Sequence, residues 1–108
     1  MAEPSIHRVY NAGKPRFQLR QGEEGLSVFD ANNVTPAEIL PSFRPGSLVT
    51  THEISTIESF GLSVVPTPGD PTLPLRLRES HMEIRASEGM TRKQFKAALR
   101  SLERALGG

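Results

Sequence analysis

Residues 79–87, with the sequence ESHMEIRAS, alternate between apolar and polar side chains. Successive side chains of a β-strand point to opposite faces of its sheet, so a strand over residues 80–86 would separate two sets of side chains. The apolar set is Met82, Ile84 and Ala86. The polar set is His81, Glu83 and Arg85. We therefore predict a strand that buries one face in the core, while its polar face either meets water or lines a cleft.

Other short strand patterns lie along the chain, separated by turns rich in proline and glycine. The strand candidates are residues 5–10, 17–19, 26–29 and 62–65, of which 26–29 can also be read as the start of a helix. Residues 43–46 are expected to form a turn, residues 66–74 a loop, and residues 75–78 a lead into the strand over 80–86. Short strands mixed with helices, without βαβ regularity, predict an α+β fold of mixed or antiparallel strands.

Helices are predicted where capping signals precede apolar periodicity. Residues 35–38 (TPAE) form a capping box, but Pro41 limits that helix to about one turn. Thr51 is expected to cap a short helix over residues 52–60. Residues 91–94 form a second capping box, and the apolar stripe that follows predicts a C-terminal helix.

Length and composition limit the classes of protein. The chain of 108 residues predicts a single domain over residues 1–108. Its net charge of +1 creates no global field that would attract nucleic acid or an anionic membrane, and the lack of cysteine excludes disulfides and thiolate chemistry. Since no signal-peptide pattern or membrane-length apolar run occurs, we expect a cytoplasmic protein, with export by a machine that needs no cleavable signal left open.

Few residues are candidates for chemistry. No two histidines have the spacing of metal ligands, so no metal site is expected. His52 would lie in the first turn of a helix as a surface residue, and the basic residues of the last helix would form a solvated face. The remaining candidates are the polar face of the strand over residues 80–86, together with Arg8 and Ser27.

The order of several motifs resembles a known family. The motifs are IHRVY at residues 6–10, GLSVFD at 25–30, RPG at 44–46, SHMEI at 80–84 and the helix after Thr91. In this order they are similar to small interbacterial toxins of the type VI secretion system, which carry a diphtheria-toxin-like, ADP-ribosyltransferase-type fold. Two positions depart from that family, because Leu26 and Glu83 each stand where the family has threonine.

The resemblance implies an ADP-ribosyltransferase-like fold and NAD as cofactor. Arg8 and its neighbour His7 would bind NAD, Arg8 through the pyrophosphate. Ser27 would hold the ribose or support the catalytic carboxylate. Glu83 would stabilise the oxocarbenium-like state that forms when the nicotinamide–ribose bond breaks, and His81 would bind ribose or transfer a proton.

The function implied is that of a cytotoxic protein that transfers ADP-ribose to an intracellular target or hydrolyses NAD. An immunity or antitoxin protein that covers the active-site cleft is the expected partner. The residues leave two alternatives open. One is a metal-independent toxin ribonuclease that uses His81 and Glu83, with Arg8 or Arg85 on the scissile phosphate, and nucleic acid is a partner only in that case. The other is a non-enzymatic interaction module whose last helix docks a partner.

Overall fold

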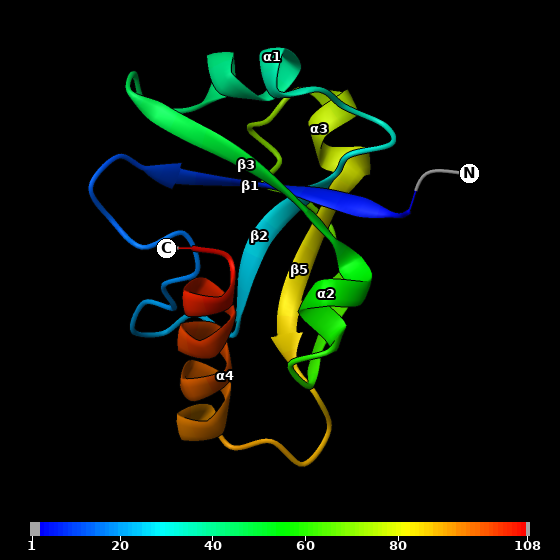
Figure 1. The fold of residues 1–108 in the computed structure, drawn as a ribbon. Helices are drawn as coiled ribbons and strands as arrows, with labels where there is room; N and C mark the ends of the chain where they lie inside the picture. Colours follow the sequence, from blue (N-terminus) through cyan, green and yellow to red (C-terminus); the bar gives the residue numbers. More distant parts are fainter. Residues whose placement is uncertain (1–2, 108) are drawn as a thin grey trace.

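A five-stranded antiparallel sheet forms the centre of the protein, in the strand order β3-β1-β2-β5-β4 (Figure 1). The structure is a computed structural model and describes residues 3–107. The strands are β1 (Ser5–Asn11), β2 (Gly25–Asp30), β3 (Ser47–Glu53), β4 (Leu62–Pro66) and β5 (His81–Ala86). The strand patterns at residues 5–10, 26–29, 62–65 and 80–86 are thus confirmed as strands, with small shifts at their ends.

Short helices connect the strands, and a longer helix closes the chain. The helices are α1 (Pro36–Ile39), followed by a 3-10 turn (Leu40–Ser42), α2 (Ile54–Glu58), α3 (Leu75–Ser80) and α4 (Arg92–Ala105). Both predicted capping boxes form, since the Thr35 and Thr91 hydroxyls accept hydrogen bonds from the backbone N–H of Glu38 and Gln94. The protein is therefore a small α+β domain, as its sequence predicts.

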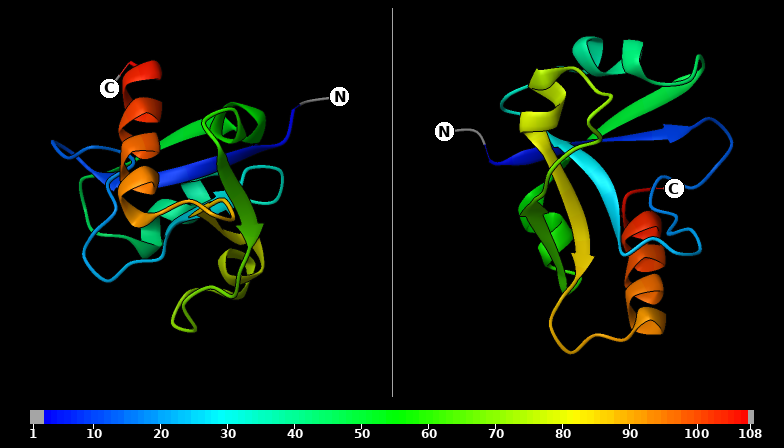
Figure 2. Two further views of the ribbon diagram at one scale, coloured as in Figure 1. Left: turned by 90° about the horizontal axis from the view of Figure 1, so that it is seen from below. Right: turned by 180° about the vertical axis from the view of Figure 1, so that it is seen from behind.

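The sheet is covered on both faces (Figure 2). Ile84 of β5 is fully buried in the main core, where α4 and α2 pack against the sheet; the core includes Ile6, Leu26, Val28, Ile57, Ile84, Phe95, Leu99 and Leu102. A smaller apolar cluster on the other face brings Phe29 of β2 against α1 and α3, and it consists of Phe29, Val34, Ile39 and Leu77. Because this second cluster covers part of the polar face of β5, that face is only partly open to water.

Three local predictions differ from the structure. The helix expected over residues 52–60 forms only over Ile54–Glu58, because β3 runs through Glu53 and Thr51 lies in that strand instead of capping the helix. Seven residue pairs join β3 to β1, and this ladder satisfies the backbone groups that a helix would have used. Residues 17–19 form no strand, because the Phe17 N–H donates to the Glu103 carboxylate. Residues 75–78, expected to lead into the strand over 80–86, are part of α3, which runs through Ser80, so that β5 begins at His81.

His52, expected on the surface of a helix, lies in β3 and is buried. Its ring meets the Phe17 ring edge-on at 5.2 Å, and its Nε2 lies 2.7 Å from the Thr50 hydroxyl. Burial lowers the pKa of His52 below its ordinary value, and the positive charge of Arg16 adds to this effect. The neutral imidazole is therefore the form that the folded protein favours.

We expect this histidine to make the protein less stable in acid. The pKa of His52 in the folded protein lies below the unfolded value of about 6.5. Its contribution to the free energy of unfolding is therefore present above that pH and is lost as the pH falls through the folded-state pKa. The substitution His52→Phe keeps an aromatic ring on Phe17 but cannot be protonated. Urea unfolding from neutral to mildly acidic pH should show a shallower loss of stability in His52→Phe than in the wild type, and equal slopes would contradict this account.

Candidate functional site

Candidate residues from three strands lie on one face of the sheet. His7 pairs with Phe29 and Phe29 pairs with His81, so these three side chains form one row across β1, β2 and β5. Ser27 of β2 pairs directly with Glu83 of β5 in the neighbouring row of the same face. The strand register therefore brings together residues that are more than fifty positions apart in the sequence.

A cavity of about 430 Å³ lies over this face, and we call it the central pocket. Its walls are formed by Ser27, Phe29, Ser42, Phe43, Pro68, Asp70, Thr72, Leu73, His81 and Glu83. The three residues proposed from the sequence as catalytic, Ser27, His81 and Glu83, thus line one pocket. The proline- and glycine-rich loop after β4 supplies the outer wall, so the polar face of β5 lines a cavity as well as meeting water.

His81 is held in place by the loop after β4. Its Nδ1 lies 2.9 Å from the Thr67 hydroxyl and 3.3 Å from the Thr67 carbonyl oxygen, and its ring meets the Phe29 ring edge-on at 5.6 Å. Because a carbonyl oxygen only accepts, the second contact favours a proton on Nδ1. Within residues 3–107 the Nε2 atom makes no hydrogen bond, which leaves its lone pair available for a ligand or a proton.

Glu83 and Ser27 differ in how far their side chains are engaged. The Glu83 Oε1 atom accepts a hydrogen bond from the Arg85 Nε at 2.8 Å, and an Arg85 Nη atom of the same ion pair lies 2.7 Å from it. This ion pair fixes the carboxylate and leaves Oε2 without a partner among the described residues. The Ser27 side chain is exposed and makes no hydrogen bond in the same part of the chain. Both groups can therefore meet a bound molecule.

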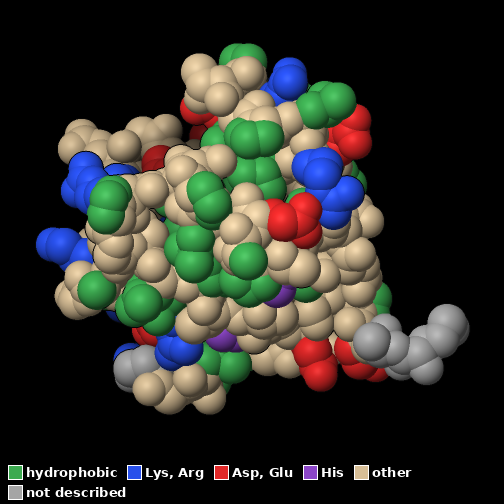
Figure 3. All heavy atoms as spheres, turned by 90° about the horizontal axis from the view of Figure 1, so that it is seen from above, with side chains coloured by type: hydrophobic (Ala, Val, Ile, Leu, Met, Phe, Trp, Pro, Cys, Tyr) green, Lys and Arg blue, Asp and Glu red, His purple; other side chains and the backbone are tan. Residues whose placement is uncertain are grey.

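His7, proposed from the sequence as a cofactor ligand, is buried and has both ring nitrogens engaged. Its Nε2 lies 3.0 Å from the Val34 carbonyl oxygen and must donate to it, so Nδ1 accepts from the Thr51 hydroxyl at 2.7 Å. From the side of α1 and α3, only small parts of the histidine side chains are visible (Figure 3). In this arrangement His7 positions β1, β3 and the segment before α1 relative to one another.

Arg8 bridges the place where β1 separates from β2. Only two residue pairs join these strands, whereas five join β2 to β5. Beyond His7 the side chain of Arg8 crosses the gap, where its Nε donates to the Arg16 carbonyl at 2.7 Å and an Nη donates to the Ser27 carbonyl at 2.8 Å. Burial lowers the pKa of this guanidinium, and no carboxylate of residues 3–107 forms an ion pair with it.

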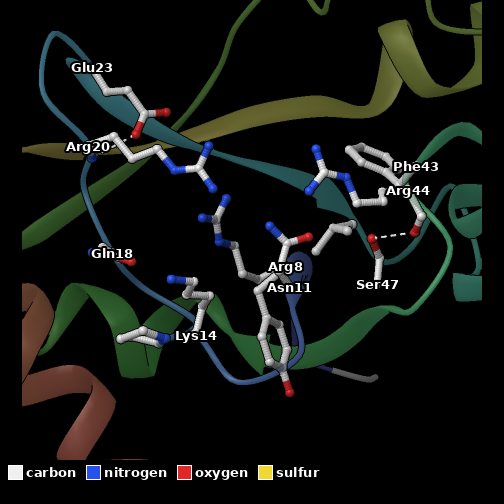
Figure 4. Close-up of a pocket in the computed structure, with 12 residues that line it drawn as sticks. Arg8, Asn11, Lys14, Gln18, Arg20, Glu23, Phe43, Arg44 and Ser47 are labelled. Atoms are coloured by element: carbon white, nitrogen blue, oxygen red, sulfur yellow. Dashed lines mark hydrogen bonds between the residues drawn. The ribbon is translucent and has the colours of Figure 1, made fainter.

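A second cavity, of about 280 Å³, adjoins this gap and is shown in Figure 4. We call it the basic pocket, because Arg8, Lys14, Arg20 and Arg44 line it with one acidic residue, Glu23. Phe43 lies on the wall of both the basic pocket and the central pocket, so the two cavities are neighbours. Sequence reasoning missed Lys14, Arg20 and Arg44, because they lie in turns where no periodicity shows which way a side chain points.

The C-terminal helix α4 positions Arg16, whose carbonyl accepts the hydrogen bond from Arg8. Glu103 of α4 accepts a hydrogen bond from the Arg16 guanidinium at 2.8 Å and another from the Phe17 N–H at 2.9 Å, and Arg16 in turn donates to the Leu106 carbonyl. Burial alone would raise the pKa of the Glu103 carboxyl, but the bonds from Arg16 and Phe17 outweigh it and the pKa is lowered. The carbonyl that accepts from Arg8 is thereby held by α4.

Other features of the described residues bear on the expected classes of function. No group of three or more histidine, cysteine or carboxylate side chains within residues 3–107 is arranged to hold a metal ion. In the same residues, no helix has the length and apolar character needed to cross a membrane. Of the basic residues on α4, Arg92 is engaged, because its guanidinium donates to the carbonyls of Glu23 and Arg20.

We expect Arg8 to be a structural residue first. Removing its side chain in Arg8→Ala leaves two carbonyls without their charged donor and should lower the free energy of unfolding by about 1–3 kcal/mol. Arg44→Ala is the matched control, because the Arg44 guanidinium makes no hydrogen bond within residues 3–107, and its effect should stay below about 0.5 kcal/mol. Urea denaturation measures both values, and equal stabilities of the two variants would contradict the bridging role.

Comparisons with protein-family models, with curated proteins and with solved structures gave no significant match to this chain. The resemblance to type VI secretion toxins, and with it the ADP-ribosyltransferase-like fold, therefore stays a prediction based on sequence motifs. The features of the described residues that bear on function are the two neighbouring pockets and the side chains that line them.

Proposed function

We propose that the protein is an NAD-dependent cytotoxic enzyme that transfers ADP-ribose to an intracellular target or hydrolyses NAD. The observation that carries the proposal is the direct cross-strand pair of Ser27 and Glu83 in the central pocket, with His81 on the same wall. A carboxylate can stabilise the positive charge that develops when an N-glycosidic bond breaks, a hydroxyl can bind the ribose, and an imidazole can transfer a proton. The adjoining basic pocket adds positive charge that fits an anionic dinucleotide.

Each side chain has a role that follows from its surroundings. Cleavage of the nicotinamide–ribose bond develops positive charge on the ribose, which the fixed Glu83 carboxylate would stabilise. The exposed Ser27 hydroxyl would bind a ribose hydroxyl beside it. His81 would use its free Nε2 to accept a proton from the attacking water or acceptor, since Thr67 holds the other nitrogen.

The same neighbourhood supports a second candidate, a metal-independent ribonuclease. The basic pocket beside His81 and Glu83 would suit a phosphodiester as well as a dinucleotide. In that case His81 acts as general acid or base and the arginines hold the scissile phosphate. We give NAD priority, because the central pocket is a bounded cavity of about 430 Å³ that suits a small molecule.

Purified protein incubated with NAD should release nicotinamide, and chromatography of the products provides the measurement. Glu83→Gln keeps the size of the side chain but removes its charge, so we expect a rate loss of roughly a hundredfold or more. His81→Gln should cause a similar loss, and thermal melts are needed beside it because His81 is buried. Glu88→Gln removes an exposed carboxylate outside both pockets and serves as the control.

The outcomes separate the candidates. Nicotinamide release that depends on Glu83 supports the proposal. Fragmentation of total RNA without nicotinamide release would favour the ribonuclease, and neither activity in folded protein would favour an interaction module. Full NAD turnover by a folded Glu83→Gln variant would remove this carboxylate from the mechanism.

A cytotoxic enzyme also needs a partner that silences it in the producing cell. We propose an immunity or antitoxin protein that covers the mouth of the central pocket, beside the exposed Ser27. Expression of the chain alone in bacteria should stop growth, and Glu83→Gln should relieve the arrest at equal protein level. Growth curves with immunoblots measure this, and harmless accumulation of folded wild-type protein would count against the toxin function.

A further inference from the structure

We propose that the basic pocket is a diphosphate-binding site in which Arg20 and Arg44, assisted by Lys14, bind the ligand, while Arg8 serves to bridge β1 and β2. The ligand in question is the diphosphate of the dinucleotide, so this inference rests on the proposed function. It differs from the expectation drawn from the sequence, which gave the pyrophosphate to Arg8 alone. Four cationic side chains and one carboxylate line this cavity of about 280 Å³.

The protein offsets the positive charge of the pocket only in part, through the nearby carboxylates of Glu23 and Glu103. The ion pairs within residues 3–107 are Arg16–Glu103, Arg76–Glu38 and Arg85–Glu83, and none involves a cation of this pocket. Glu23 is the acidic residue on its wall, and its carboxylate accepts a hydrogen bond from the backbone N–H of Arg20. The whole chain has a net charge of only +1, so positive charge is concentrated here. Such a cluster favours a ligand with more than one negative charge.

Arg8 is poorly placed to be the main ligand-binding group. Its Nε and one of its Nη atoms already donate to the carbonyls of Arg16 and Ser27. A guanidinium binds phosphate most strongly with two parallel N–H groups, and these contacts engage donors on two sides of the fork. Two of its five N–H groups are thus used within the protein, and Arg8 can contribute its charge and the remaining Nη donors to a ligand whose main contacts lie elsewhere.

Arg20 and Arg44 have the opposite arrangement, with a fixed backbone and a free side chain. The Arg20 carbonyl accepts a hydrogen bond from Arg92 of α4 at 2.8 Å, and the Arg20 N–H donates to Glu23. The Arg44 carbonyl accepts from both the hydroxyl and the N–H of Ser47, at 2.7 and 3.1 Å. Neither guanidinium makes a hydrogen bond within residues 3–107. Hydrogen bonds thus fix the backbone of both residues, while their guanidinium groups are available to bind a ligand.

The directions of these side chains explain the preference for two phosphoryl groups. Arg20 and Arg44 enter the pocket from opposite sides (Figure 4). Their guanidinium groups point toward the middle of the pocket, where the Arg8 guanidinium also lies, and the Lys14 ammonium lies lower in the view. A single phosphate can contact one wall, whereas a diphosphate can contact both. Because Phe43 belongs to both pockets, a dinucleotide whose diphosphate lies here can extend its ribose toward Ser27 and Glu83.

Titration calorimetry with inorganic pyrophosphate tests the site without any need for catalysis. We expect binding that weakens with added salt and is tighter than that of inorganic phosphate. Arg20→Ala and Arg44→Ala should each weaken pyrophosphate binding by about tenfold or more, the effect of losing a charge-assisted hydrogen bond. Arg100→Ala is the matched control, because it removes an exposed arginine of α4 that does not line the basic pocket. The affinity of this variant for pyrophosphate should equal that of the wild type.

Competition identifies the source of the diphosphate. Displacement of pyrophosphate by NAD supports both the site and the proposed function. Displacement by ADP but not by NAD would keep the diphosphate site and argue against the proposed function. The site is overturned if the folded wild-type protein does not bind pyrophosphate, or if Arg20→Ala and Arg44→Ala both bind it as tightly as Arg100→Ala does.

Discussion

The early separation of β1 from β2 opens the sheet beside Arg8 and shapes the basic pocket. A sheet whose strands paired along their full length would leave no opening between them, but β1 and β2 share only two residue pairs. Arg8 fills the gap with two hydrogen bonds from one guanidinium, and burial without an ion pair makes that charge costly. The hydrogen bonds and the neighbouring pocket, open to water, compensate for this cost, so the opening persists and becomes the basic pocket.

Each pocket is held by contacts from a different part of the fold. Glu103 and Arg16 connect α4 to the carbonyl that Arg8 contacts, and Arg92 connects the start of the same helix to the loop that carries Arg20. The most regular element of the protein therefore supports its least regular segment, residues 12–24. On the other side, Thr67 of the loop after β4 contacts the Nδ1 of His81 and orients its ring. Polar groups at the site are thus held by contacts outside it, which limits the reorganisation needed when a ligand binds.

Burial on both faces of the sheet decides what the polar residues of β5 can do. The alternation of this strand correctly predicted that Ile84 is in the core and that His81 and Glu83 share the opposite face. It did not predict that the opposite face carries its own apolar cluster around Phe29, because Val34, Ile39 and Leu77 come from separate segments. The polar face of β5, which the sequence placed either in water or in a cleft, lines the central pocket together with Phe29 of that cluster.

The sequence predicted the local elements whose signals are short in range. Capping boxes defined α1 and α4, and period-two alternation defined β5, because each depends on residues within one or two turns or pleats. It misassigned residues 52–53, since a capping threonine reads as a helix start until a partner strand supplies the competing hydrogen bonds. The sequence did not predict the register that pairs Ser27 with Glu83, because that register depends on contacts between distant segments. It did not predict the convergence of Arg20 and Arg44 either, because side-chain directions in turns follow from such contacts.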